Sequence, residues 1–383
     1  MGTSSRDIDE WCRQTVEFVH SPAVVAAAAA MDSGQPLPSE IEAAAHQLGL
    51  TTARLPVRHG GHGLTMADYV RLLECVGQGP GGLRVYIHGQ NTKWEMFERF
   101  GTAEQKERYL PTFARGEWAV SFSLTEPHAG TGNDIVTRAA PCEAGWVING
   151  HKHLVTHAAA AQVIVVLAQL EDSGVTAFLV PAGTPGVTIE PMAQPMGTRG
   201  ISLGEVKFDD CVLPESAMLG LPGQGLEIGL SFLDITRTAL SACAVGLAQR
   251  ALDLARDRAI DRVTFGKPLA ARQAVQMKIA DMEMAISAGR TLVVAAATKL
   301  DVDDYARHEA AVAKRYTARM VTNVADTGMQ VFGGIGYTAH TPLDRIARDA
   351  RSFWFEEGTD EALAFVIART ILAADRPEPK QSS

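Results

Sequence analysis

A run of small and hydroxyl-bearing residues follows an alternating apolar segment in the first half of the chain. Val120, Phe122 and Leu124 alternate with serines, which is typical of a half-buried strand. The strand leads into a glycine-rich loop, 125–134, whose backbone N–H groups and hydroxyls could bind an anion or a polar ring. No helix pattern follows this loop, so it does not match a dinucleotide-binding fingerprint. Taken alone, the segment is also consistent with a surface turn.

Three histidines raise the question of a metal site. His151, His153 and His157 are two and four positions apart, so a strand would place all three on one face. No carboxylate or cysteine beside them in the sequence completes a ligand set. We therefore expect a hairpin surface here and no metal.

The five cysteines are widely spaced, and no C-x-x-C pair occurs. This spacing does not support a zinc ribbon, a thioredoxin-type pair or a disulfide framework. We expect free thiols in a reducing compartment.

The composition is that of an ordinary globular protein, with 46% hydrophobic and 21% charged residues and a formal net charge of -9. No basic stripe occurs, so we expect no nucleic-acid partner. The longest apolar run, 22–31, is too short to span a bilayer, and the N-terminus lacks the apolar core of a signal peptide. We therefore expect a cytoplasmic protein with no membrane partner.

Three zones follow one another along the chain. Helical patterns dominate residues 1–116, short strand patterns dominate 117–218, and long helical patterns return over 219–383, where the last residues form a flexible tail. We expect a mostly α fold with a central β domain (α+β): an N-terminal helical domain, a small β-barrel or sandwich, and a C-terminal four-helix bundle.

Local signals mark single elements within these zones. The spacing of Tyr69, Leu72, Leu73 and Val76 predicts a helix over 66–76, and apolar positions over 275–286 predict a bundle face. A charged helix over 104–110 is expected to end at Pro111. Asn149–Gly150, between two extended runs, predicts a hairpin turn.

Several segments together resemble one family. Leu124-Thr-Glu-Pro-x-Ala-Gly130 resembles the first signature of the acyl-CoA dehydrogenase family of flavoproteins. The flanking matches are 99–111 before it, Arg262-Val-Thr-Phe-Gly-Lys-Pro268, Gln330-Val-Phe-Gly-Gly-Ile-Gly-Tyr337 and Glu357-Gly-Thr359, in the family's order. The resemblance runs from about residue 40 to 373 and implies the three-part fold expected above.

The family reaction is FAD-dependent α,β-dehydrogenation of an acyl thioester. The resemblance implies that Glu357 abstracts the α-proton, that flavin N5 accepts the β-hydride, and that the Glu357 backbone N–H binds the thioester carbonyl. A carboxylate desolvated by substrate would have a raised pKa, which suits a base. Some family members place the base directly before a bundle arginine. Here that position is Thr236, before Arg237, and threonine cannot act as a base.

The resemblance also implies residues that bind cofactor and substrate. FAD would contact positions around the flavin ring and, from a neighbouring subunit, its phosphates and adenine: Phe122, Leu124, Thr125, Thr156, Arg262, Thr264, Phe265, Gln273, Gln330, Gly333, Gly334, Thr359 and Glu361. The substrate would contact Thr131, Arg237 and Gly358. The implied partners are an acyl-CoA or acyl-carrier-protein substrate, an electron-transfer flavoprotein, and further copies of the chain as a homodimer or homotetramer.

The sequence departs from the family pattern at two informative places. Leu154 replaces a tryptophan beside the flavin, which would leave the ring edge less covered. Glu356 replaces an aromatic residue before the base; since adjacent residues usually point apart, we expect it to face solvent. A second carboxylate in the pocket would instead favour polar or cationic acyl groups.

Three functions therefore remain open. The first is the dehydrogenase. The second is an acyl-CoA oxidase or flavin monooxygenase on the same fold, favoured by the thinner cover at Leu154. The third is an inactive partner subunit, which the presence of Glu357, Arg262 and Gln273 argues against.

Overall fold

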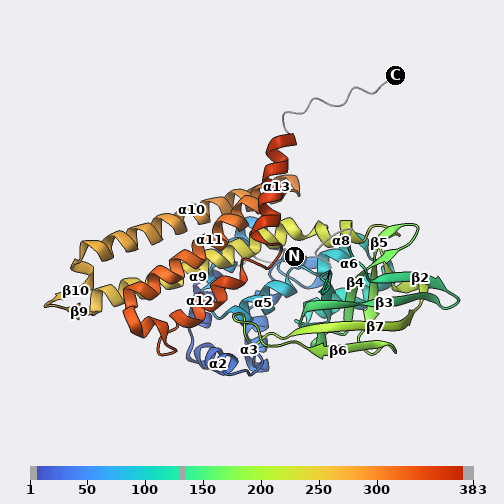
Figure 1. Ribbon diagram of the computed structural model, residues 1–383, viewed down its shortest axis with the longest axis horizontal. Helices are drawn as coiled ribbons and strands as arrows, with labels where there is room; N and C mark the ends of the chain where they lie inside the picture. The colour runs from blue at the N-terminus through green and yellow to red at the C-terminus, as the bar shows by residue number, and fades with distance from the viewer. Residues whose placement is uncertain (1–6, 129–133, 374–383) are drawn as a thin grey trace, which may run out of the picture. The chain divides into compact units, whose positions relative to one another are not determined.

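The computed structural model describes residues 7–128 and 134–373 (Figure 1). Contacts between Cα atoms divide them into two compact units. Among the described residues, unit 1 comprises 7–19, 66–79 and 234–373, and unit 2 comprises 20–65, 80–128 and 134–233. The N-terminal helices are thus divided between the two units, with some in unit 1 and the others in unit 2. The expected order of a helical, a β-sheet and a second helical part is confirmed, whereas the boundaries at 116 and 218 stay a prediction.

Unit 1 is built from long helices. Its elements are α1 (Ile8–Val19), α4 (Met66–Gly77), α9 (Leu233–Asp261, whose first residue falls in unit 2), β9 (Val263–Thr264), β10 (Lys267–Pro268), η5 (Leu269–Ala271), α10 (Gln273–Asp303), α11 (Arg307–Phe332), η6 (Gly333–Tyr337), α12 (Leu343–Ser352) and α13 (Asp360–Ala373). The helices α10 and α11 run side by side (Figure 1). The apolar face predicted on α4 is buried at all four positions, and Met282 and Ile286 of α10 are buried too.

The central helix of unit 1 is α9, which is buried along most of its length. Glycines bring α4 into direct backbone contact with it. A Cβ on Gly77 would lie 2.2 Å from the Cys243 carbonyl oxygen, and one on Gly246 would lie 1.9 Å from that of Glu74. Larger residues would therefore separate α4 from α9.

Unit 2 joins a sheet to short helices. Its elements are α2 (Pro22–Asp32), α3 (Ser39–Gln47), η1 (Leu50–Thr52), η2 (Val57–His59), α5 (Gly81–Gln90), α6 (Trp94–Phe100), α7 (Ala103–Ala114), β1 (Val120–Ser123), β2 (Arg138–Cys142), β3 (Gly145–Thr156), η3 (Ala158–Ala160), β4 (Val163–Leu170), β5 (Gly174–Pro181), β6 (Val187–Pro191), β7 (Leu203–Leu213), η4 (Glu215–Ala217), β8 (Met218–Leu219) and α8 (Gly225–Ser231).

The eight strands form one sheet in the order β6-β7-β3-β2-β4-β5-β8, with β1 parallel to β4 off this path. Alternate residues of β4 face opposite cores. Val163, Val165 and Leu167 pack with α6, α7 and α8, whereas Ile164 and Val166 pack with side chains of β3 and β7 from the same sheet. Both faces of β4 are buried, which explains its continuous apolar sequence.

The hairpin predicted at Asn149–Gly150 is wrong. Both residues lie inside β3, and the turn falls earlier, at 143–144. The Asn149 side chain donates to Asp210 Oδ1 (3.0 Å) and accepts from the Asp210 N–H (2.8 Å). The register of β3 against β7 shifts between Ile148 and Gly150. Asn149 and Gly150 therefore lie at an irregularity within a paired strand instead of forming a turn.

The helix expected to end at Pro111 continues to Ala114. A capping box begins it: the Thr102 hydroxyl accepts from the Gln105 N–H, and the Gln105 side chain accepts from the Thr102 N–H. Phe113, beyond the proline, is buried in the core with Phe97. Tertiary packing therefore outweighs the one intrahelical bond that a proline removes.

A buried ion pair closes the loop after β1. Lys152 Nζ on β3 donates to Glu126 Oε1 (2.7 Å) and to the Leu124 carbonyl (3.1 Å), and both charged side chains are almost fully buried. Glu126 also accepts from the Val136 and Thr137 N–H groups (2.7 and 3.0 Å). Burial alone would raise the pKa of Glu126, but the bonds from Lys152 and the amides lower it overall. The pair therefore ties both sides of the loop to β3.

Residues 225–261 form one helical stretch that is long and apolar enough to cross a membrane, but 83% of its most apolar window is buried inside the fold. Within the described residues this is the behaviour of a core helix.

We predict that Glu126→Gln lowers the free energy of unfolding by about 3–5 kcal/mol, because it leaves the Lys152 ammonium buried beside a neutral partner. The double variant Glu126→Gln/Lys152→Met should lose less, since it removes that charge. Urea titration of the purified protein measures this, with Glu117→Gln in an exposed ion pair as the control. A loss no larger than that of the control would contradict the role given to the pair.

Candidate active site

The loop between α12 and α13 carries Glu357 in an uncommon backbone conformation. Glu357 has φ +55° and Gly358 has φ +105°, both in the left-handed region. A Cβ on Gly358 would lie 3.4 Å from Arg237 Nη2. The Glu-Gly order therefore supports a sharp reversal of the chain against α9.

Two buried cations hold the carbonyl groups of this loop. Arg237 Nε of α9 donates to the Glu357 carbonyl oxygen (3.0 Å). Lys314 Nζ of α11 donates to the carbonyls of Gly358 (3.0 Å) and Phe353. Burial lowers the pKa of Lys314 to about 8, and the charges of Glu356 and Glu357 oppose that shift. The assignment of Arg237 to substrate stays a prediction, and its side chain also holds the Glu357 backbone. The sequence analysis did not single out Lys314.

Two arginines of α11 fix the end of the loop where α13 begins. Arg319 donates twice to Asp360 (2.9 and 2.7 Å), and Arg315 donates once (3.1 Å). The bonds from Arg319, followed by those from Arg315, lower the pKa of Asp360 to about 2. The Thr359 hydroxyl accepts from the Ala362 N–H (3.3 Å) and so caps α13. Glu361, one residue beyond Asp360, is exposed.

The Glu357 carboxyl is set apart by its surroundings. Burial raises its pKa above the usual range, and the charge of Glu356 raises it further. A side-chain hydrogen bond with Thr236 and the charges of Arg237 and Lys314 act in the opposite direction. Thr236 thus contacts the carboxyl that the sequence assigned as base. Sequence reasoning excluded Thr236 as a base but missed this contact, although its place before Arg237 was the available signal.

Glu356 is half-buried, and its charge acts on both Glu357 and Lys314. It is therefore closer to the Glu357 carboxyl than a fully solvent-facing residue would be. Its effect on substrate choice stays a hypothesis.

A second group of sequence-assigned residues lies beyond the opposite end of α9. Arg262, Thr264 and Phe265 belong to the β9–β10 hairpin, which Arg272 braces through its bond to the Thr264 carbonyl (2.7 Å). Phe265, at the tip, has φ +48° and is 97% exposed. Gln273 begins α10 nearby and is exposed.

The end of α11 lies at this same end of unit 1, because Arg258 of α9 contacts the Phe332 ring (5.4 Å to the centroid). Gln330, Gly333 and Gly334 are exposed there. A Cβ added to either glycine would meet no atom within 4 Å. The glycines leave open space beside arginine and amide groups, and this donor set fits the phosphates and polar ring of a dinucleotide.

The two groups are far apart. Arg237 and Asp261 are 24 residues apart on α9, which at 1.5 Å per residue is about 36 Å. Unit 1 therefore carries two separate sets of candidate site residues.

Unit 2 brings together the ends of β1 and β3. The Ser121 hydroxyl donates to the Thr156 carbonyl (2.8 Å), and the His153 N–H donates to the Thr125 carbonyl (3.0 Å). Leu124 is held through the bond from Lys152 to its carbonyl. Leu124, Thr125 and Thr156, assigned to the flavin ring from the sequence, are thus neighbours and only partly buried.

Other residues of this group behave differently. The Phe122 side chain packs edge-on against Phe232 (5.5 Å between centroids) beside the core with α8, and its assignment to the flavin stays a prediction. Leu154 has φ +54° and is 49% exposed, beside a register shift in β3. Thr131 lies outside the described residues.

Two of the three histidines have different surroundings. His151 Nε2 lies 2.9 Å from Glu205 Oε2. The sequence pattern did not predict this carboxylate beside the histidine. His157 packs edge-on against Trp118, and burial lowers its pKa to about 4. In the described ranges, 7–128 and 134–373, no three His, Cys, Asp or Glu side chains gather as metal ligands.

The order of helical, β-sheet and helical parts, with these groups of residues, defines the acyl-CoA dehydrogenase class of flavoproteins. The chain belongs to this family. Its N-terminal, middle and C-terminal domain models match residues 6–117, 121–211 and 223–372. The human mitochondrial short-chain specific acyl-CoA dehydrogenase is 35% identical over 335 residues, covering 86% of this chain and 81% of that protein.

Solved structures agree with this family. Butyryl-CoA dehydrogenase from Megasphaera elsdenii matches with a TM-score of 0.90 and 31% identity, covering 97% of this chain and 100% of that one. A glutaryl-CoA dehydrogenase from Mycobacterium smegmatis in complex with FADH2 matches at 0.90 and 27%, over 97% and 95%. The prolyl acyl carrier protein oxidase AnaB matches at 0.87 and 25%, over 96% and 100%. The chain is thus an FAD-dependent oxidoreductase of this family.

We predict that Thr236→Val shifts the acidic limb of the kcat/KM profile to higher pH. The hydrogen bond from Thr236 lowers the pKa of Glu357, so its loss raises that pKa, and the free base then forms only at higher pH. Thr238→Val is the matched control, because the Thr238 hydroxyl donates only to its own helix, at the Asp234 carbonyl (2.8 Å). Equal shifts in both variants would argue against the contact.

Proposed function

We propose that this chain catalyses α,β-dehydrogenation of an acyl-CoA thioester with Glu357 as the general base. The observation that carries the proposal is the Glu357 carboxyl itself: its pKa is raised by burial, and its backbone is held by Arg237. A carboxyl with a raised pKa matches proton abstraction near neutral pH better than an ordinary one.

The chemistry needs a base at one carbon and a hydride acceptor at the next. Bound FAD supplies the acceptor, since flavins take up hydride. Glu357 takes the α-proton, which a thioester makes only weakly acidic, so the carbonyl must also be polarised. We assign that role to the backbone N–H of Glu357.

Arg237 and Lys314 act through the loop backbone. The C=O and N–H of one planar peptide point in opposite directions. Fixing the Glu357 carbonyl with Arg237 therefore also fixes the direction of the Gly358 N–H, and Lys314 fixes the next peptide in the same way. We assign both as positioning residues that keep the base in reach of one carbon atom.

The substrate and the electron acceptor are the finer parts of the proposal. Similarity to the short-chain and butyryl-CoA enzymes makes butyryl-CoA the first thioester to test. An electron-transfer flavoprotein is the proposed acceptor, from the family. The exposed Leu154 and the similarity to AnaB favour a second candidate, an oxidase acting on a carrier-protein thioester.

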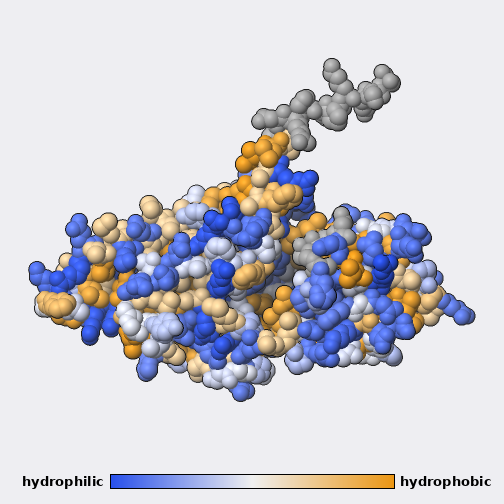
Figure 2. Space-filling view, in the orientation of Figure 1, coloured by the Kyte–Doolittle hydropathy of each residue, from blue (hydrophilic) through white to orange (hydrophobic). Residues whose placement is uncertain are grey.

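We also propose that the chain acts as a homo-oligomer. Phe265, at the tip of the β9–β10 hairpin, is an exposed aromatic residue. The hairpin lies about 36 Å from Arg237 along α9. We therefore assign the hairpin to the FAD that is bound by a second copy of the chain. The C-terminal helix α13 also exposes Phe365, Ile371 and Leu372, and Figure 2 shows apolar residues gathered on it. Apolar faces of this kind mark protein interfaces.

We predict that Glu357→Gln abolishes the anaerobic bleaching of FAD by butyryl-CoA, with a loss of at least about 10³-fold, while FAD stays bound. Gln keeps the size of the side chain but cannot take a proton. Glu283→Gln, at an exposed position of α10, should bleach like the wild type. Bleaching at the wild-type rate in Glu357→Gln would contradict the assignment of the base.

We predict that Phe265→Asp lowers the FAD content of the purified protein several-fold, because a charge replaces the apolar hairpin tip. Val302→Asp, at a 77% exposed apolar position of α10, is the control. Absorption spectra give the FAD content and light scattering gives the mass. A monomer that keeps its full FAD content would contradict the proposed second copy.

A further inference from the structure

Two half-buried thiols contact each other in unit 1. Along the sequence, both lie well before the two groups of candidate site residues of this unit. Cys12 of α1 and Cys75 of α4 are free cysteines, and their side chains form a hydrogen bond. They are 63 positions apart in the chain, so their spacing gives no sign of a pair.

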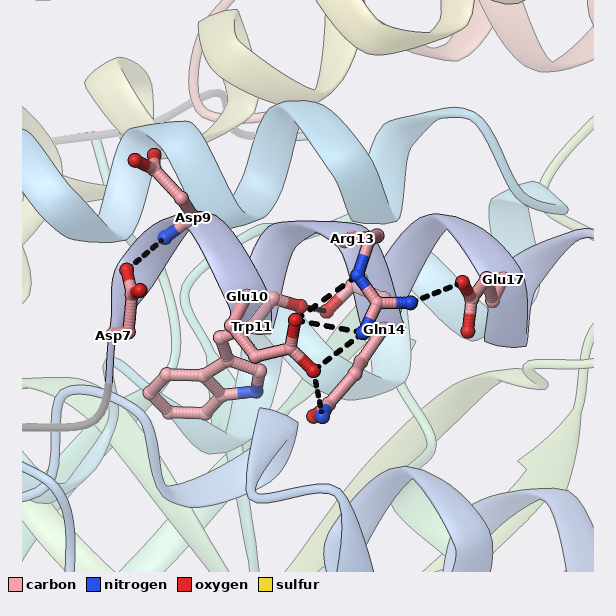
Figure 3. Close-up of polar contacts among 8 residues, drawn as sticks. Asp7, Asp9, Glu10, Trp11, Arg13, Gln14 and Glu17 are labelled. Carbon is pink, nitrogen blue, oxygen red and sulfur yellow. Dashed lines mark hydrogen bonds and ion pairs between the residues drawn. The ribbon is translucent and has the colours of Figure 1, made fainter.

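The contacts on either side show that α1 and α4 run parallel with these cysteines in register. Asp9 pairs with Arg71, one turn before each cysteine. Beyond them, Val19 Cβ lies 3.1 Å from the position of a Cβ on Gly79. The outward face of α1 is occupied separately: Arg13 pairs with Glu10 and Glu17 (Figure 3). Helix packing, and not the thiols alone, therefore brings the two sulfurs together.

The two thiols are not equivalent. The hydrogen bond with Cys75 and the charge of Arg71 lower the pKa of Cys12, against burial and the charges of Asp9 and Glu74. The same hydrogen bond, with burial, raises the pKa of Cys75. An asymmetric pair of this kind has one thiol that ionises first and a second that can respond to it.

We propose that Cys12 and Cys75 form a reversible redox site that reacts with small disulfides such as oxidised glutathione and closes a disulfide between α1 and α4. This inference is independent of the proposed function.

The reaction balances in two exchanges. The Cys12 thiolate attacks one sulfur of glutathione disulfide, which forms a mixed disulfide and releases one glutathione thiolate. The Cys75 thiolate then attacks Cys12 Sγ, which releases the second glutathione. The two cysteines lose two electrons and two protons in all, and glutathione disulfide is reduced to two thiols.

The bond would tie α1 to the interior of unit 1. Next to Cys75, Glu74 binds Arg290 of α10 (2.7 Å), and Gly77 contacts α9. Because α4 packs directly against α9, the disulfide would hold α1 against the part of unit 1 that contains the helix of Thr236 and Arg237. We expect oxidation to hold α1 in place and to raise the thermal midpoint of the FAD-bound protein by roughly 5 °C.

The test treats the FAD-bound protein with oxidised glutathione and maps disulfides in a non-reduced digest by mass spectrometry. The expected product is one peptide pair joining Cys12 to Cys75, reversed by dithiothreitol. The rise in thermal midpoint should accompany it and be absent in Cys12→Ser.

Cys142→Ser, which removes an exposed thiol of unit 2, is the matched control and should still form the bridge. Cys12→Ser and Cys75→Ser, both checked for FAD content and thermal midpoint when reduced, should not. A stable glutathione adduct on Cys12 with Cys75 still free, or a bridge to any other cysteine, would overturn the proposal.

Discussion

The structure depends on keeping one carboxyl group away from water while its backbone turns sharply. Glu357 and Gly358 both have positive φ angles, which a free chain would rarely hold together. The loop keeps this shape because cations of two helices bind its carbonyls: Arg237 from α9 and Lys314 from α11. Those cations also limit how far burial can raise the pKa of the carboxyl. The same contacts thus set the position and the proton affinity of the carboxyl that we propose as the base.

The long helices explain how such contacts can be made. A residue in mid-helix is fixed by the whole helix, so Arg237 and Lys314 are more precisely placed than loop residues would be. The close approach of α4 to α9, which Gly77 and Gly246 permit, buries one side of the helix that carries Arg237. In unit 2 the Glu126–Lys152 ion pair has a similar positioning role, because it fixes the segment that contains Leu124 and Thr125.

Much of the fold follows from the sequence, since apolar spacing reports burial directly, as at Tyr69, Leu72 and Val76 of α4. Local signals failed where distant contacts outweighed them: Asn149 binds Asp210 across the sheet, and α7 continues through Pro111 because Phe113 packs in the core. For the site, the Glu-Gly-Thr motif singled out Glu357. The position of Thr236 before Arg237 was a usable signal for its contact with Glu357. The contacts of Lys314 and the pairing of Cys12 with Cys75 were not predictable, because each joins elements whose packing no local pattern encodes.

The most direct test of the central claim is proton exchange at the α-carbon. The FAD-bound protein is incubated in D2O, without an electron acceptor, with an acyl-CoA that reduces its flavin, and deuterium in the recovered thioester is measured. The account predicts incorporation at the α-carbon by the wild type and none by Glu357→Gln. Exchange that persists in Glu357→Gln would show that another group removes the proton and would contradict the account.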